Sequence, residues 1–230
     1  MNKVKQLGLL VLAVCALGAV MASSAFAALP TILPGTGLTI SGSGGEGTLR
    51  TLAGTEVVCT GNTAEVKFAA NTNLAPVHIS FTACKSPTLG GAKCTGLTDT
   101  ASSGTILALG EIHLVFDKLG SGTSLGVAGL FLIEELGFEC GALATVKVKG
   151  SVLCLISPIN VKVKTTETAT LKCEELPPKT GDPKETEYWN AAGEKQAPLL
   201  LTSINGGTFE SSAENAEAKL KATTEYELMG

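Results

Sequence analysis

Apolar and polar residues alternate along much of this chain. The alternation is clearest in residues 77–82, 111–117 and 146–156, where one parity is mostly apolar and the other mostly polar. A period of two is typical of a β-strand with one face in a core and the other in water. Residues 125–133 are more uniformly apolar, which favours a central strand. Glycine-rich stretches between these segments predict turns, so the pattern indicates an all-β protein.

The C-terminal segment 211–228 admits two interpretations. Ser211 and Glu214 have the spacing of a helix capping box, and good helix formers follow them. From Ala216 to Leu228, however, the even-numbered positions are mostly apolar and the odd-numbered positions carry the charges. A helix would scatter those charges around its circumference, so the alternation favours a strand.

Two segments lack the alternation. Residues 28–47 are rich in Pro, Gly, Ser and Thr and predict a flexible lead-in, and Glu174–Lys184 predicts a proline-broken loop. Only some 46 residues follow that loop, too few for an easy independent core. We therefore expect residues 48–230 to form a single antiparallel β-sandwich, Ig-like or jelly-roll-like, whose last strands return to the same sheets.

The N-terminal residues 1–27 have the three parts of a secretory signal peptide. Lys3 and Lys5 form a positive start, residues 7–20 are an uncharged apolar run, and Ala25-Phe26-Ala27 has small residues at the cleavage positions. The run of 14 residues is short of the roughly 20 needed to cross a bilayer. We expect cleavage after Ala27, a secreted or cell-surface location and no membrane span thereafter.

The charge of the chain disfavours nucleic-acid binding. The net charge is −4, and removal of residues 1–27, which hold two bases and no acid, makes it −6. Arg50 is the only arginine, and no cluster of basic residues is present. Nucleic-acid binding needs a positive surface, preferably with arginine side chains, so we expect no nucleic-acid partner.

Six cysteines follow the expected cleavage site, and an even number in an exported chain indicates disulfides rather than zinc ligands. Strand parity places Cys154 and Cys173 in the core, which favours pairing between them. Cys84 has the parity of the polar face and lies near Cys94 across a Gly-Gly loop, so a second disulfide is expected there. Cys59 and Cys140 remain as the third pair.

Residues Gly122–Gly126 match the G-x-S-x-G pattern of a nucleophile elbow. That motif needs a strand before the serine, a helix after it, and then an acid and a histidine. Both His78 and His113 precede Ser124, and the downstream residues favour a strand. We therefore interpret the motif as a hairpin turn.

His113 with Glu111 and Asp117 is the most promising polar cluster in the sequence. Alternation places the three side chains on one strand face, where they would suit a general base or half of a metal site. Only His78 is available as a second imidazole. The pattern favours a solvated strand face, with no metal or other cofactor.

A glycosidase-like hydrolase is the main catalytic alternative, since such an enzyme needs two suitably spaced carboxyl groups. Glu134 and Glu135 are adjacent, so on a strand they point to opposite faces. Sugar binding also favours exposed aromatic platforms, and the neighbours Tyr188 and Trp189 do not form one flat platform on a regular strand. Weak carbohydrate binding is kept as a minor alternative for the protein.

Four segments are similar to an uncharacterised group of exported, β-rich bacterial proteins that occur as paralogous sets. They are CTGNTAEVKF at Cys59–Phe68, ISFTACK at Ile79–Lys85, KCTG at Lys93–Gly96 and INGGTFE at Ile204–Glu210. The resemblance covers residues 57–230 and implies a secreted β protein, without a catalytic residue or cofactor. Cys154 and Cys173 are additions to the common pattern. The sequence thus predicts a secreted, non-enzymatic structural or binding module of unknown partner.

Overall fold

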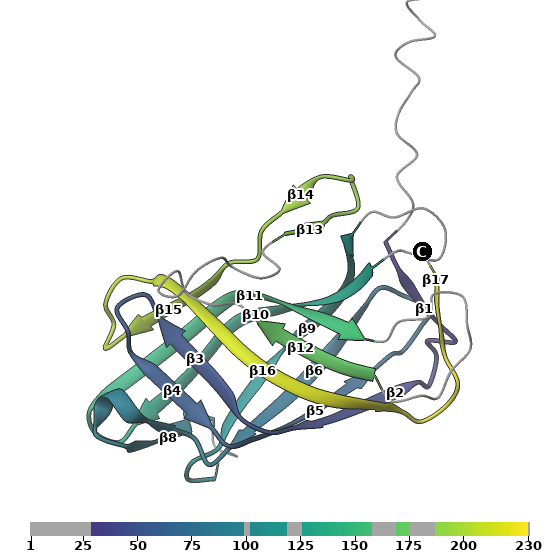
Figure 1. Cartoon of the computed structure of the whole chain (residues 1–230). Helices are drawn as coiled ribbons and strands as arrows, with labels where there is room; N and C mark the ends of the chain where they lie inside the picture. The colour runs from purple at the N-terminus through teal and green to yellow at the C-terminus, as the bar shows by residue number, and fades with distance from the viewer. Residues whose placement is uncertain (1–28, 99–101, 119–125, 158–168, 175–186, 230) are drawn as a thin grey trace, which may run out of the picture.

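The computed structural model describes residues 29–98, 102–118, 126–157, 169–174 and 187–229. Strands dominate this part of the chain, and its one short helical turn, η1, spans Pro87–Leu89 (Figure 1). The strands are β1 (Thr31–Leu33), β2 (Thr39–Gly44), β3 (Gly47–Thr51), β4 (Glu56–Cys59), β5 (Gly61–Lys67), β6 (Leu74–Thr82), β7 (Lys85–Ser86), β8 (Ala92–Gly96), β9 (Ile106–Lys118), β10 (Gly126–Cys140), β11 (Ala144–Ser157), β12 (Ala169–Glu174), β13 (Tyr188–Trp189), β14 (Lys195–Gln196), β15 (Leu200–Ile204), β16 (Glu210–Ala222) and β17 (Glu227–Met229).

Most of the described strands pair in antiparallel fashion in two closed circuits that share β10, β11 and β16, while β1 and β17 form a separate two-stranded sheet. The first circuit runs β16-β2-β5-β6-β9-β10-β11-β12 and returns to β16. The second runs β16-β3-β4-β7-β8-β10-β11-β15 and returns to β16. The sheet therefore folds into two β layers over one core, and strand pairing joins the layers along their edges (Figure 1). The all-β, antiparallel class predicted from the sequence is confirmed.

The alternation pattern located the long strands correctly. Residues 126–133 begin β10, which pairs with β9 on one side and β11 on the other, as expected of a central strand. The C-terminal segment is a strand rather than a helix, and Ala218 and Ala222 on the even parity of β16 are buried while Lys219 and Lys221 are exposed.

The lead-in expected at residues 28–47 is not an irregular segment. It contains β1, which pairs with β17, and β2, which lies between β16 and β5. Two glycines of β2 serve packing rather than a turn. A Cβ at Gly42 would lie 2.9 Å from Leu220, and one at Gly44 would collide with the Glu217 carbonyl oxygen. Glycine inside a strand often marks such a close approach, and composition alone does not distinguish it from a turn.

Three disulfides link the described strands, and two of the expected pairings are wrong. Cys154–Cys173 is confirmed, with the two residues directly opposite on β11 and β12. The other bonds are Cys59–Cys84 and Cys94–Cys140, in place of the expected Cys84–Cys94 and Cys59–Cys140.

The error arises at Ala83, just after β6. Its backbone has a φ of 51°, in the left-handed region, so the alternation of β6 does not continue to the next residue. Cys84 is 1% exposed instead of lying on the polar face. Cys94 is its neighbour, with the Cys94 amide donating to the Cys84 carbonyl at 2.9 Å, but each of them bonds to the cysteine on its other side. Disulfides of this number are typical of proteins that fold in an oxidising compartment.

A short hairpin of β13 and β14 covers part of the outer surface of the sheet. Tyr188 on β13 packs against a second buried cluster of Val115, Ala128, Leu130 and Leu153, which lies outside the main core. Within the described ranges, no helix has the length and apolarity needed to cross a membrane. The expected signal peptide with its cleavage site, the Ser124 motif except for its last residue Gly126, and all but the first residue of the Glu174–Lys184 loop lie outside the described residues.

Candidate functional site

The cluster predicted around His113 separates into a pair and a distant acid. His113 Nε2 lies 3.3 Å from Glu111 Oε2 on the outer face of β9, and their side chains are 25% and 56% exposed. Asp117 packs over Gly126, where a Cβ would collide with its carboxylate, and its Oδ1 has no hydrogen-bond partner in the described structure. His78 lies on β6 opposite Leu109. In the described ranges, no group of three or more His, Cys, Asp or Glu side chains is placed to hold a metal ion.

The other acidic and aromatic candidates do not converge on one site either. Glu134 and Glu135 occupy an irregularity of β10 and are both exposed, and Glu135 forms an ion pair with Lys147 at 2.8 Å. Trp189 is stacked under the Lys195 ammonium group at 5.3 Å, and Tyr188 covers the second apolar cluster. No carboxylate pair and no open aromatic platform results from these four residues.

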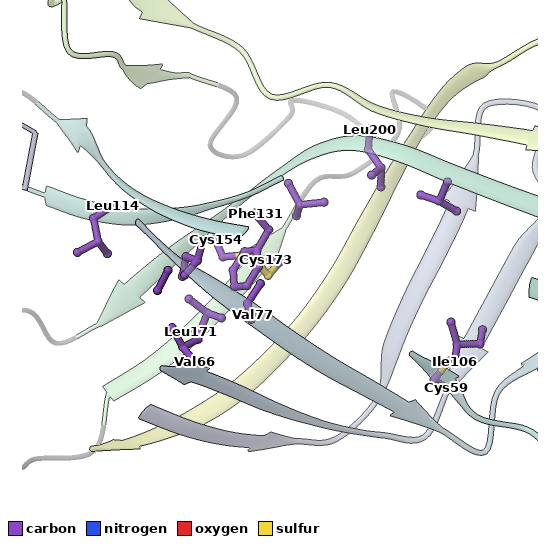
Figure 2. Packing of buried hydrophobic residues seen from close by; sticks show 14 of the residues in the cluster. Cys59, Val66, Val77, Ile106, Leu114, Phe131, Cys154, Leu171, Cys173 and Leu200 are labelled. Carbon is purple, nitrogen blue, oxygen red and sulfur yellow. A yellow bond between two sulfur atoms is a disulfide. The ribbon is translucent and has the colours of Figure 1, made fainter. Parts of the chain in front are cut away.

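The main candidate site is a cavity between the β layers, of about 90 Å³. Its wall combines strands of both circuits with the shared strands β10, β11 and β16, so it lies where the two circuits adjoin. Figure 2 shows several wall residues in the space between the layers, among them Val77, Phe131 and Leu171. The volume exceeds the roughly 10–15 Å³ that one water needs and is below the ~150 Å³ of an engineered cavity that binds benzene.

The wall of this cavity is almost entirely apolar. Aliphatic and aromatic residues form most of it, together with three cysteines that are all in disulfides. The wall includes Leu109 and Gly110 on β9 and Leu132 on β10. These residues lie at the point where the pairing between β9 and β10 ends. Leu109 is 56% exposed, so the cavity extends towards the molecular surface at this point.

Glu214 is the acidic side chain that the fold places on the inner face of this wall. It has the parity of Ala216 and Ala218 on β16, which line the same cavity, and its cross-strand neighbour on β3 is Leu49. Burial raises the pKa of the Glu214 carboxyl from its usual 4.5 to about 7, because an apolar surrounding disfavours the charged form. No hydrogen bond or ion pair joins this carboxyl to another described residue. The residue as a whole is half-buried, and its oxygens are not among the fully buried atoms without a partner, so the carboxyl keeps some accessible surface.

The remaining polar groups of the wall are Thr48, Asn62 and Glu217. Thr48 lies on the parity of β3 opposite to Leu49, the cross-strand neighbour of Glu214. The Asn62 side-chain amide donates to the carbonyl oxygens of Gly45 and Glu217, at 3.1 and 3.3 Å. Glu217 contributes to the wall but is exposed, on the parity of β16 opposite to that of Glu214, where its register partner is the exposed Lys172. Glu214 is therefore the polar group available to a molecule inside the cavity.

A second, smaller cavity of about 50 Å³ lies beside the first. Its wall is apolar apart from Tyr226, whose pKa is raised by burial. The two cavities share Ala64, Phe131 and Leu171 as wall residues, so only a thin apolar partition separates them.

Sequence reasoning missed Glu214 because its position was assessed for helix capping. The alternation in the sequence indicates an inward-facing side chain at every second residue from Ala216 onwards. The same alternation, continued two residues towards the N-terminus, also places Glu214 on the inner face. The cavity itself has no sequence signal, because it depends on how the side chains of nine strands fill the space between the layers.

No protein-family model, curated protein or solved structure matches this chain.

Proposed function

We propose that the protein is an exported, non-enzymatic binding protein that holds a small, largely apolar molecule in the cavity between its β layers. The observation that carries this proposal is the apolar cavity with one unpartnered carboxyl group, Glu214, in its inner wall. Ligand sites are typically apolar concavities with a few polar groups that fix the orientation of the ligand.

The position of Glu214 supports a binding role because it does not serve the fold. A carboxyl without a hydrogen-bond partner in an apolar wall costs stability, and an apolar side chain would avoid that cost. Departures from such packing rules are expected at functional sites. The glycosidase-like alternative gains no support here, because Glu217 is on the opposite face of β16 from Glu214.

The binding proposal is tested with 1-butanol, an uncharged molecule of suitable size. Titration of the wild-type protein followed by methyl NMR should shift signals of wall residues such as Val77 and Val148 and leave those of the outer surface unchanged. Ala216→Leu, which fills the cavity from β16, should weaken this binding at least about tenfold, since overpacking removes the space. Lys221→Leu, on the exposed outer face of β16, is the matched control and should bind as the wild type does. Equal binding to both variants, or no binding to the wild type, contradicts the proposal.

Export is the second part of the proposal. It rests on the charged, apolar and A-x-A segments of residues 1–27 together with three disulfides among the described strands. When the full chain is expressed in a host with a general secretory pathway, the protein outside the cytoplasm should begin at Ala28. N-terminal sequencing measures this directly, and an extracytoplasmic protein that retains Met1 would refute signal cleavage.

A further inference from the structure

Resting on the proposed function, we propose that the ligand is a small amphiphile with an amine at its polar end, whose ammonium group is held by Glu214 and whose apolar part fills the cavity. The ligand class is set by what the inner wall offers. An alkyl or similar body matches the aliphatic and aromatic surface, and the polar end must satisfy a carboxyl group that has no partner within the described structure.

The charge of the wall favours a cation over an anion. The ionisable residues in it are Glu214 and Glu217, both acidic, and no Lys, Arg or His belongs to it. The protein as a whole is also negative, with a net charge of −4. An anionic ligand would bring a second negative charge next to Glu214, whereas an ammonium group provides the opposite charge that a desolvated carboxylate needs.

The hydrogen-bond donors of the wall support the same choice. An anion needs donors. The Asn62 amide group already donates to two backbone carbonyls, and the Thr48 hydroxyl lies on the parity of β3 opposite to Leu49 and Glu214. An ammonium group instead supplies three donors and needs only acceptors. The Glu214 carboxylate provides these acceptors, so the charged ends of ligand and protein complement each other.

Amine binding should be coupled to the protonation of Glu214. Below pH 7 most Glu214 carboxyls are protonated, because burial raises the pKa of this group to about 7. Binding of an ammonium ion then releases a proton from Glu214, and affinity falls about tenfold for each pH unit below 7. The other wall residues, from β3, β4, β5, β6, β9, β10, β11 and β12, carry no titrating side chain because their cysteines are oxidised, and Glu217 on β16 is exposed to solvent.

Three probes of nearly equal size separate the possible ligand classes: n-butylamine, 1-butanol and butyrate. At pH 8 the wild-type protein should bind n-butylamine at least about tenfold more tightly than 1-butanol, and butyrate more weakly than either. Glu214→Gln should remove the preference for the amine while keeping 1-butanol binding, and Glu217→Gln should retain the preference. At pH 6 the wild-type preference should be about tenfold smaller than at pH 8.

The outcomes distinguish this inference from the proposal on which it rests. If 1-butanol or butyrate binds as tightly as n-butylamine, the amine assignment is overturned and the binding cavity stands. The same holds if Glu214→Gln keeps the wild-type preference. If none of the three probes binds the wild-type protein, both proposals fail together.

Discussion

Replacing both Cys94 and Cys140 by alanine should lower the free energy of unfolding by about 4 kcal/mol. This disulfide closes the longest loop of the three, with a sequence separation of 46. A crosslink restricts the unfolded chain more strongly as its loop grows. The two residues are also fully buried and directly opposite each other on β8 and β10. The bond therefore joins strands that are remote in sequence at the centre of the second circuit.

Denaturant unfolding of the oxidised proteins measures this change, and the Cys154→Ala/Cys173→Ala protein is the matched comparison. Its disulfide has a sequence separation of 19 and should contribute about 3 kcal/mol. A loss of less than 1 kcal/mol for the Cys94/Cys140 protein would contradict the expectation. So would peptide mapping of the wild-type protein that showed a Cys84–Cys94 bond.

The three disulfides show where alternation in the sequence predicts the direction of a side chain and where it does not. Cys154 and Cys173 each lie within a regular strand, so their alternation with neighbouring residues correctly predicted that they face the core. Cys84 lies beyond the end of β6. Because the backbone at Ala83 is left-handed, the Cys84 side chain does not follow the alternation of that strand. Four cysteines then lie side by side: Cys59, Cys94 and Cys140 on β4, β8 and β10, and Cys84 just before β7. Sequence spacing favours a bond between Cys84 and Cys94, which are the nearest pair along the chain. The structure instead joins Cys59 to Cys84 and Cys94 to Cys140.

The N-terminal strands show a second limit of sequence reasoning. Glycine-rich composition predicted an irregular segment, because glycine is frequent in turns. In β2 the glycines instead allow Leu220 and the Glu217 backbone to approach closely. Whether a glycine of β2 serves a turn or a close contact depends on β16, a strand almost 180 residues away. The local sequence around β2 does not reveal that partner.

The candidate site was partly accessible from the same alternation. The outer pair of Glu111 and His113 was placed correctly on one strand face, because both residues lie in a long regular strand. The inner position of Glu214 follows from the parity of β16 once that segment is known to be a strand. The shape of the cavity could not be predicted, since it is the space left by side chains from nine strands.

Glu214→Gln should make the protein more stable than the wild type at pH 8, by up to about 3 kcal/mol, and leave its stability nearly unchanged at pH 4.5. The pKa of this carboxyl is raised from 4.5 to about 7 in the folded protein, so the folded state holds the proton at pH values where the unfolded state has lost it. Unfolding between these two values releases a proton. Stability is therefore lost as the pH rises from about 4.5 to 7, and the loss is complete above 7. Glutamine has no proton to lose, so the stability of the variant lacks this part of the pH dependence.

Urea unfolding of the unliganded wild-type and variant proteins at several pH values between 4.5 and 8 measures the difference in their free energies of unfolding. That difference should grow in favour of Glu214→Gln as the pH rises and then become constant, which separates Glu214 from the many other acids that titrate in both proteins. Glu217→Gln, three residues along the same strand with an exposed side chain, is the control and should follow the wild type throughout. A difference that does not change with pH would show that the Glu214 carboxyl is solvated in the folded protein. A variant that is less stable at pH 8 would instead show that the carboxylate has a stabilising partner in the folded state, and either outcome would remove the uncompensated carboxyl on which ligand binding by Glu214 depends.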